Sequence, residues 1–103
     1  MMDEKRIERI RAMEGRLEVC AKRVGQLSEA CREWMEVQDD FVALVDYYYS
    51  GAWSDDREAD ENGEIPDDLP RGVLSEDAIY DLLYRQHLLT KELIRTALHN
   101  LEQ

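Results

Sequence analysis

The sequence predicts an all-α protein: a long amphipathic helix and a shorter antiparallel helix, joined by an acidic connector into a helical hairpin or coiled-coil-like bundle. The first observation is a heptad repeat in which eleven of twelve seam positions are apolar or aromatic. Its a positions are Ile10, Leu17, Val24, Cys31, Gln38 and Val45, and its d positions are Met13, Cys20, Leu27, Trp34, Phe41 and Tyr48. Such a seam must pack on another helix. The second observation is a separate amphipathic pattern after Ser75.

The first helix is expected to cover about residues 3–49, a stretch that contains no proline. Asp3 and Glu4 suit the positive end of the helix dipole. Gly25 falls on an outer heptad position, where it weakens the helix without disturbing the seam. A break near Gly25, with Ser28 capping a new helix, is an alternative. The heptad phase passes through Gly25 without a shift, which favours a continuous helix.

The second helix is expected to cover about residues 76–102, with Ser75 as its N-cap. At 1.5 Å per residue it spans about 40 Å, so it can cover only part of the first helix. It should lie on residues 30–49, where the flanking positions are apolar and the seam is wide. The two helices and the connector are predicted to form one domain, residues 1–103.

The N-terminal half of the first helix therefore lacks a cover within the chain. Its seam residues Ile10, Met13 and Leu17 are flanked by arginines at positions 9, 16 and 23, which is typical of a narrow two-helix seam. A second copy of the protein is the simplest cover. We therefore expect a homodimer through this half of the helix, with these three residues as partner-binding candidates.

The connector, about residues 50–75, contains eight acidic and two basic residues. Glu58, Asp60 and Asn62 resemble positions one, three and five of a calcium-binding loop. Leu69 stands where the bidentate Glu of such a loop is expected, and the nearby prolines bar an exiting helix. We therefore expect a solvated acidic turn, with no metal site and no cofactor.

Aromatic residues border the connector, among them the partner-binding candidates Tyr47, Tyr48 and Trp53. One interpretation is that these rings close the end of the helical hairpin. The other is a binding patch rimmed by carboxylates, since Tyr and Trp are frequent hot-spot residues at interfaces. The two interpretations differ in how exposed the rings are.

Composition narrows the function classes. The net charge of −11, from 13 basic and 24 acidic residues, disfavours direct nucleic-acid binding. The charged N-terminus has no apolar signal region, and no apolar run reaches the ~18 residues of a membrane span. We expect a soluble cytoplasmic protein that does not bind membranes. Cys20 and Cys31 are then reduced thiols on the seam.

Enzyme motifs are weak. The sequence has no phosphate-binding glycine loop and no nucleophile elbow or zinc-protease motif. The pair Glu33 and Glu36 has the ExxE spacing with which all-α nucleotide pyrophosphohydrolases hold magnesium. Both residues fall on outer heptad positions, however, away from the seam. We therefore predict that the protein is not an enzyme.

Several tracts resemble one family. They are Trp53, the EADENGEIP stretch at residues 58–66, the GVLSEDAIYDLL stretch at 72–83, RIERIRAMEGRL at 6–17 and EVQDD at 36–40. Together they resemble the bacterial family named domain of unknown function 4298. The resemblance covers nearly the whole chain and implies a small, helical, cytoplasmic bacterial protein. It implies no activity, ligand or catalytic residue.

The function expected from the sequence is a non-enzymatic protein–protein interaction or scaffold module. One alternative is an acidic inhibitor or decoy that occupies a basic, nucleic-acid-binding surface of a partner protein. A second alternative is a small metal-dependent all-α hydrolase.

Overall fold

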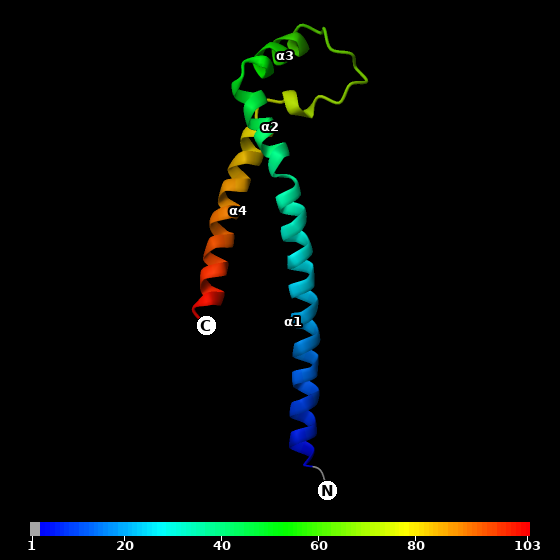
Figure 1. The fold of residues 1–103 in the computed structure, drawn as a ribbon. Helices are drawn as coiled ribbons and strands as arrows, with labels where there is room; N and C mark the ends of the chain where they lie inside the picture. Colours follow the sequence, from blue (N-terminus) through cyan, green and yellow to red (C-terminus); the bar gives the residue numbers. More distant parts are fainter. Residues whose placement is uncertain (1–2) are drawn as a thin grey trace. The chain divides into compact units, whose positions relative to one another are not determined.

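The computed structural model describes residues 3–103, and all regular elements in this range are helical (Figure 1). They are α1 (Glu4–Glu36), α2 (Gln38–Tyr49), α3 (Ala52–Glu61), the 3-10 helix η1 (Gly72–Leu74) and α4 (Ala78–Leu101). The predicted all-α class is confirmed. The chain divides into two compact units, one ending at Gln38 and the other beginning at Asp39.

Helix α1 makes up nearly all of the described part of the first unit. Its 33 residues correspond to about 50 Å at 1.5 Å per residue. Asp3 caps its start: the side chain accepts a hydrogen bond of 3.0 Å from the Lys5 backbone N–H, which satisfies one of the free donors at a helix start. The helix runs through Gly25 without interruption, so the alternative break there does not occur.

The long predicted helix is interrupted at Val37, which separates α1 from α2. The Val37 backbone lies at φ −94° and ψ 3°. The side-chain amide of Gln38 donates a 3.0 Å hydrogen bond to the Trp34 carbonyl in the last turn of α1. The single helix predicted over residues 3–49 is therefore two helices. The heptad spacing continues across Val37, so the pattern carries no sign of the interruption.

The connector contains a ten-residue helix, α3, which the sequence analysis did not predict. Gly51 precedes it with φ 92°, a left-handed conformation that glycine adopts without steric cost. The Ser50 hydroxyl donates to the Tyr47 carbonyl (3.0 Å) and accepts from the Ala52 N–H (3.3 Å). These bonds satisfy backbone groups on both sides of the turn at Ser50 and Gly51, so only these two residues separate α2 from α3.

Helix α3 ends in a Schellman motif centred on Gly63. The Glu64 N–H bonds to the Ala59 carbonyl at 2.9 Å, and the Gly63 N–H bonds to the Asp60 carbonyl at 3.1 Å. This double closure requires a left-handed residue, and Gly63 has φ 73°. Asn62, which resembled position five of a calcium-binding loop, therefore lies with Gly63 at the C-terminal cap of a helix.

Replacing Gly63 with alanine should lower the free energy of unfolding by about 1 kcal/mol, because a side chain at positive φ is strained. Urea unfolding followed by circular dichroism measures this change. Gly25→Ala is the matched control: Gly25 lies inside α1 with no atom near the added Cβ, so the same substitution should stabilise by about 0.5–1 kcal/mol. Equal effects at both glycines would contradict the assigned conformations.

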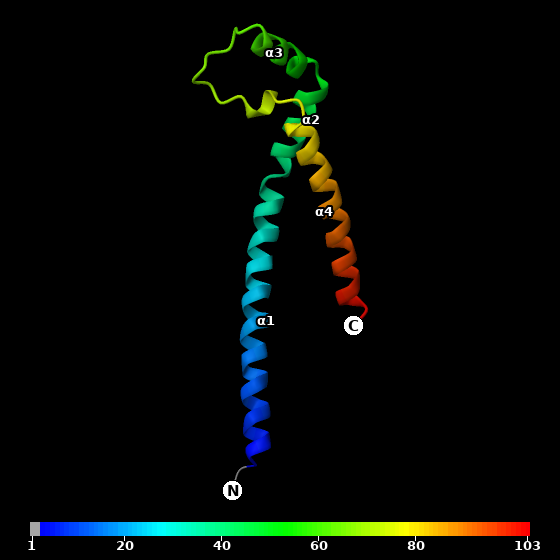
Figure 2. The same ribbon diagram turned by 180° about the vertical axis from the view of Figure 1, so that it is seen from behind.

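The second unit is held together where η1 meets α3 and α4 (Figure 2). The prediction that Ser75 is the N-cap of the last helix is wrong, because α4 begins at Ala78 and Asp77 precedes it. The Ser75 N–H instead closes η1 on the Gly72 carbonyl at 3.1 Å. Leu74 on η1 and Ile79 on α4 are 8% and 3% exposed, and they are the buried residues among 3–103. The buried core of the second unit is therefore small.

Candidate protein interaction site

The most extensive uncovered apolar surface of the first unit is the seam of α1. We define the α1 seam as the a and d residues from Ile10 to Leu27. Five of them are large hydrophobics: Ile10 (53% exposed), Met13 (52%), Leu17 (62%), Val24 (69%) and Leu27 (58%). The sixth, Cys20, is an exposed free thiol, as is Cys31 further along. No residue of α1 is buried. The predicted seam therefore exists as a continuous helical face that nothing else in the first unit covers.

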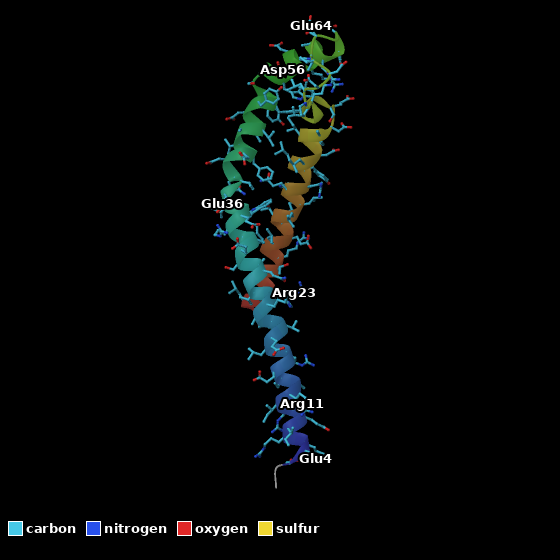
Figure 3. All side chains as sticks on the ribbon, turned by 90° about the vertical axis from the view of Figure 1, so that its right-hand side faces the viewer. Glu4, Arg11, Arg23, Glu36, Asp56 and Glu64 are labelled. Carbon is cyan, nitrogen blue, oxygen red and sulfur yellow. The ribbon has the colours of Figure 1, made fainter. Side chains whose placement is uncertain are left out.

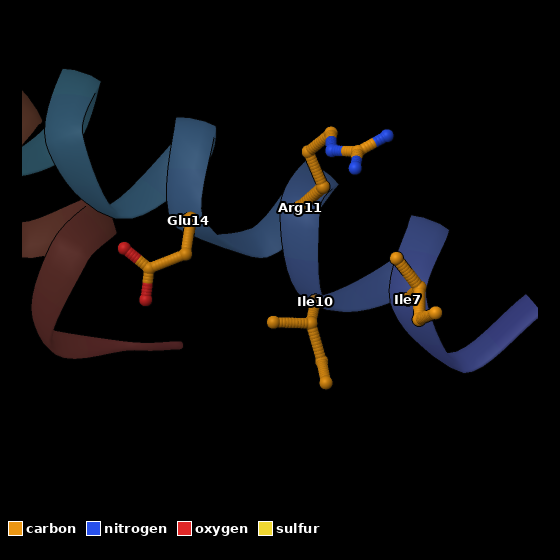
Figure 4. Close-up of a pocket in the computed structure, with 4 residues that line it drawn as sticks. All are labelled: Ile7, Ile10, Arg11 and Glu14. Carbon is orange, nitrogen blue, oxygen red and sulfur yellow. The ribbon is translucent and has the colours of Figure 1, made fainter. Parts of the chain in front are cut away.

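The N-terminal end of the seam forms a shallow hollow lined by Ile7, Ile10, Arg11 and Glu14 (Figure 4). Ile10 and Glu14 lie toward the same side of the helix in this view, and the Arg11 side chain projects the other way. A carboxylate thus stands at the edge of the apolar face. Placed there, it can meet a cation on whatever helix covers the seam.

Charged side chains of α1 separate into those with partners along the helix and those without (Figure 3 labels Arg11, Arg23 and Glu36). Arg32 pairs with Glu29 and with Glu36, the latter at 2.8 Å. Within the described residues, neither Arg9 nor Glu14 takes part in an ion pair. Both therefore remain available to a partner.

In the second unit, the aromatic residues join α2, α3 and η1. The rings of Tyr48 and Trp53 lie 5.0 Å apart between centroids with planes tilted by 43°. The Trp53 Nε1–H donates a 2.9 Å hydrogen bond to the Val73 carbonyl. The Arg57 guanidinium lies 5.5 Å from the Trp53 ring centroid, within the range of a cation–π interaction. Both rings are half-buried, so they act in packing this unit and are only partly open to a partner.

Tyr47 makes a second link between α2 and α3. Its hydroxyl donates a 2.6 Å hydrogen bond to Asp56 Oδ2. Burial, followed by the hydrogen bond to Asp56 and the negative charge of that carboxylate, raises the pKa of Tyr47 from 10.0 to about 12. The link depends on the protonated phenol, because a phenolate cannot donate a hydrogen bond.

Alkaline pH should therefore weaken the second unit. The native chain holds the Tyr47 proton more tightly than the unfolded chain, so this stabilisation is complete below pH 10 and is lost as pH rises toward 12. Ultraviolet titration of tyrosinate should show that one of the five tyrosines ionises last. The Tyr47→Phe variant should lack this late step. A late step that persists in the variant would assign it to another tyrosine.

Three acidic residues of the connector pair with arginines: Asp60 and Asp67 with Arg71, and Glu61 with Arg57. Arg71 lies 3.3 Å from Asp60 and 3.9 Å from Asp67, and it donates to the Ile65 carbonyl at 3.4 Å. Glu58 and Asp60 lie within α3, whose helical backbone differs from that of a calcium-binding loop. Among residues 3–103, no three His, Cys, Asp or Glu side chains are grouped to hold a metal ion.

A cavity of about 270 Å³ lies in the second unit between α2, α3 and the segment leading into η1. Its lining residues are Tyr47, Asp56, Ile65, Leu69, Pro70, Arg71, Val73 and Leu74. The walls of this cavity come from segments far apart in the chain, so no local sequence pattern marks it. Its charged members are already engaged, Asp56 with Tyr47 and Arg71 with Asp60. These two interactions link the segments that line the cavity.

Residues 3–103 thus form an all-helical chain with two buried residues, and its longest helix presents an apolar heptad face that nothing else in the first unit covers. None of the described helices has the length and apolar character needed to cross a membrane. The chain belongs to the family described as a domain of unknown function (DUF4298), which matches residues 10–96 and confirms the resemblance. No curated protein and no solved structure matches the chain.

Proposed function

We propose that this chain is a non-enzymatic interaction module of the bacterial cytoplasm that self-associates through the α1 seam. The observation that carries the proposal is the exposure of the seam: a 33-residue helix presents apolar a and d residues, yet none of its residues is buried. An apolar stripe at heptad spacing is typical of a helix that packs on a partner helix.

Energetics favour a covered seam. Fully burying a large aliphatic side chain stabilises by roughly 1.5–3 kcal/mol. In a symmetric dimer each seam residue is buried on both copies, so every position contributes twice. Helical stability in proteins also comes mainly from packing of an amphipathic face and less from intrinsic propensity. Pairing would therefore stabilise α1 itself as well as hide its apolar surface.

The contacts of Glu36 support a non-enzymatic role. Arg32 bridges Glu36 and Glu29, so one carboxylate of the Glu33 and Glu36 pair is already neutralised by a cation. A hydrolase of the kind considered above would need both carboxylates directed at magnesium.

Sedimentation equilibrium of the full chain tests the proposal. We expect the apparent mass to rise from 12.1 kDa toward twice that value between micromolar and near-millimolar concentrations. A mass that stays at the monomer value over this whole range would overturn self-association.

A further inference from the structure

We infer that the α1 seam pairs with a second copy of this chain in parallel and in register, so that Arg9 of each copy faces Glu14 of the other. This inference rests on the proposed self-association and adds its geometry. It depends on the charges that border the seam, because the apolar residues alone would fit either orientation.

The heptad positions define the pairing. With Ile10 at a and Met13 at d, Arg9 occupies a g position and Glu14 the e position of the next heptad. In a parallel two-stranded coiled coil, a g residue contacts the e residue five positions further along the other chain. Symmetry then gives two Arg9–Glu14 pairs per dimer. Both side chains lack an ion pair within residues 3–103.

The other two arginines at g positions, Arg16 and Arg23, are also accommodated by the parallel arrangement. Arg16 would face Ala21 of the second copy, and Arg23 would face Ser28. Both facing residues are small and uncharged, so the guanidinium groups can extend into water while their stems cover the seam. No like-charged pair arises along this edge.

An antiparallel arrangement brings like charges together over the same overlap. In that orientation g residues face g residues. Among registers centred on the α1 seam, one places Arg16 opposite Arg23 of the second copy. Another places Arg23 opposite Arg23 of the second copy. Opposed like charges destabilise an interface and suppress that pairing. An antiparallel register free of these contacts is shifted along the helix until Cys20 lies opposite Cys31.

The two exposed thiols distinguish the two orientations. In the parallel dimer Cys20, at d, lies opposite Cys20 of the second copy. The test treats the full-length Cys31→Ser variant with diamide. Two thiols lose two protons and two electrons and form a disulfide, while the N=N bond of diamide accepts them and becomes a hydrazine. We expect a Cys20–Cys20 linked dimer. If only the native chain becomes linked, with Cys20 joined to Cys31 in peptide mapping, the parallel arrangement is overturned.

Charge reversal provides a second test. Arg9→Glu and Glu14→Arg should each weaken dimerisation by roughly tenfold, because two attractive pairs become repulsive. An equal mixture of the two variants should restore association as a heterodimer, in which both pairs are again opposite in charge. Arg11→Glu is the control: it makes the same charge change on a side chain that projects away from Ile10 (Figure 4). A mixture that associates no better than either variant alone would overturn the pairing.

The outcomes separate the two proposals. A chain that remains monomeric in sedimentation overturns the proposed self-association. A chain that dimerises without linking Cys20 to Cys20 overturns the parallel arrangement and leaves self-association in place.

Discussion

Replacing Leu17 with glutamate is expected to convert the dimer to a monomer. Leu17 is an a residue at the middle of the α1 seam and is 62% exposed within the single chain. The substitution therefore removes little packing from the chain itself. In the dimer, however, it places two carboxylates opposite each other in an apolar layer, where they lose hydration without gaining a partner. We expect dimerisation to weaken by about 100-fold or more.

Val19→Glu is a closely matched control for this prediction. Val19 lies two residues away, at an outer c position, and is 61% exposed. The change in charge is the same and the change in hydrophobicity is similar, and glutamate favours a helix at least as well as the valine it replaces. The two variants therefore differ mainly in whether they touch the seam. Sedimentation of both proteins measures the difference. Equal loss of association in both variants would show that the seam assignment is wrong.

Replacing Ile79 with alanine should produce the largest loss of stability in the second unit. Ile79 is 3% exposed, the lowest exposure among the large hydrophobics of the described chain, and it lies where α4 begins beside η1. Truncating a buried isoleucine removes its transfer free energy and leaves a cavity, which typically costs 2–5 kcal/mol. With Leu74 as the other buried residue, the unit has little other packing to compensate. We expect a loss of about 3 kcal/mol.

Urea unfolding, followed by tryptophan fluorescence and circular dichroism, measures this loss. Leu101→Ala is the control, because Leu101 is 83% exposed at the end of α4 and its truncation should change the free energy of unfolding by less than about 0.5 kcal/mol. If Ile79→Ala were as mild as the control, the region around η1 would not be the core of the second unit.

The sequence predicted the helices whose signal is periodic. The heptad spacing led to α1, and the apolar pattern after Ser75 led to α4, within three residues of its observed start. Both successes come from repeating local patterns, which persist over many residues.

Other features could not be predicted because they depend on single residues or on distant contacts. The turn at Val37 leaves the heptad phase unchanged, so nothing in the spacing marks it. Helix α3 has ten residues, of which six are charged, so an apolar pattern has little length over which to repeat. The hydrogen bond from Trp53 to the Val73 carbonyl joins residues twenty positions apart. Only the folded chain brings these two groups together.

Hydrogen exchange at the backbone amides of residues 10–27, measured over a range of protein concentrations, tests the central claim most directly. If the α1 seam joins two copies, protection of these amides should increase with concentration. Amides near Ile79, in the core of the second unit, should exchange at a rate that changes little. Protection of residues 10–27 that is the same at every concentration would contradict self-association through this helix.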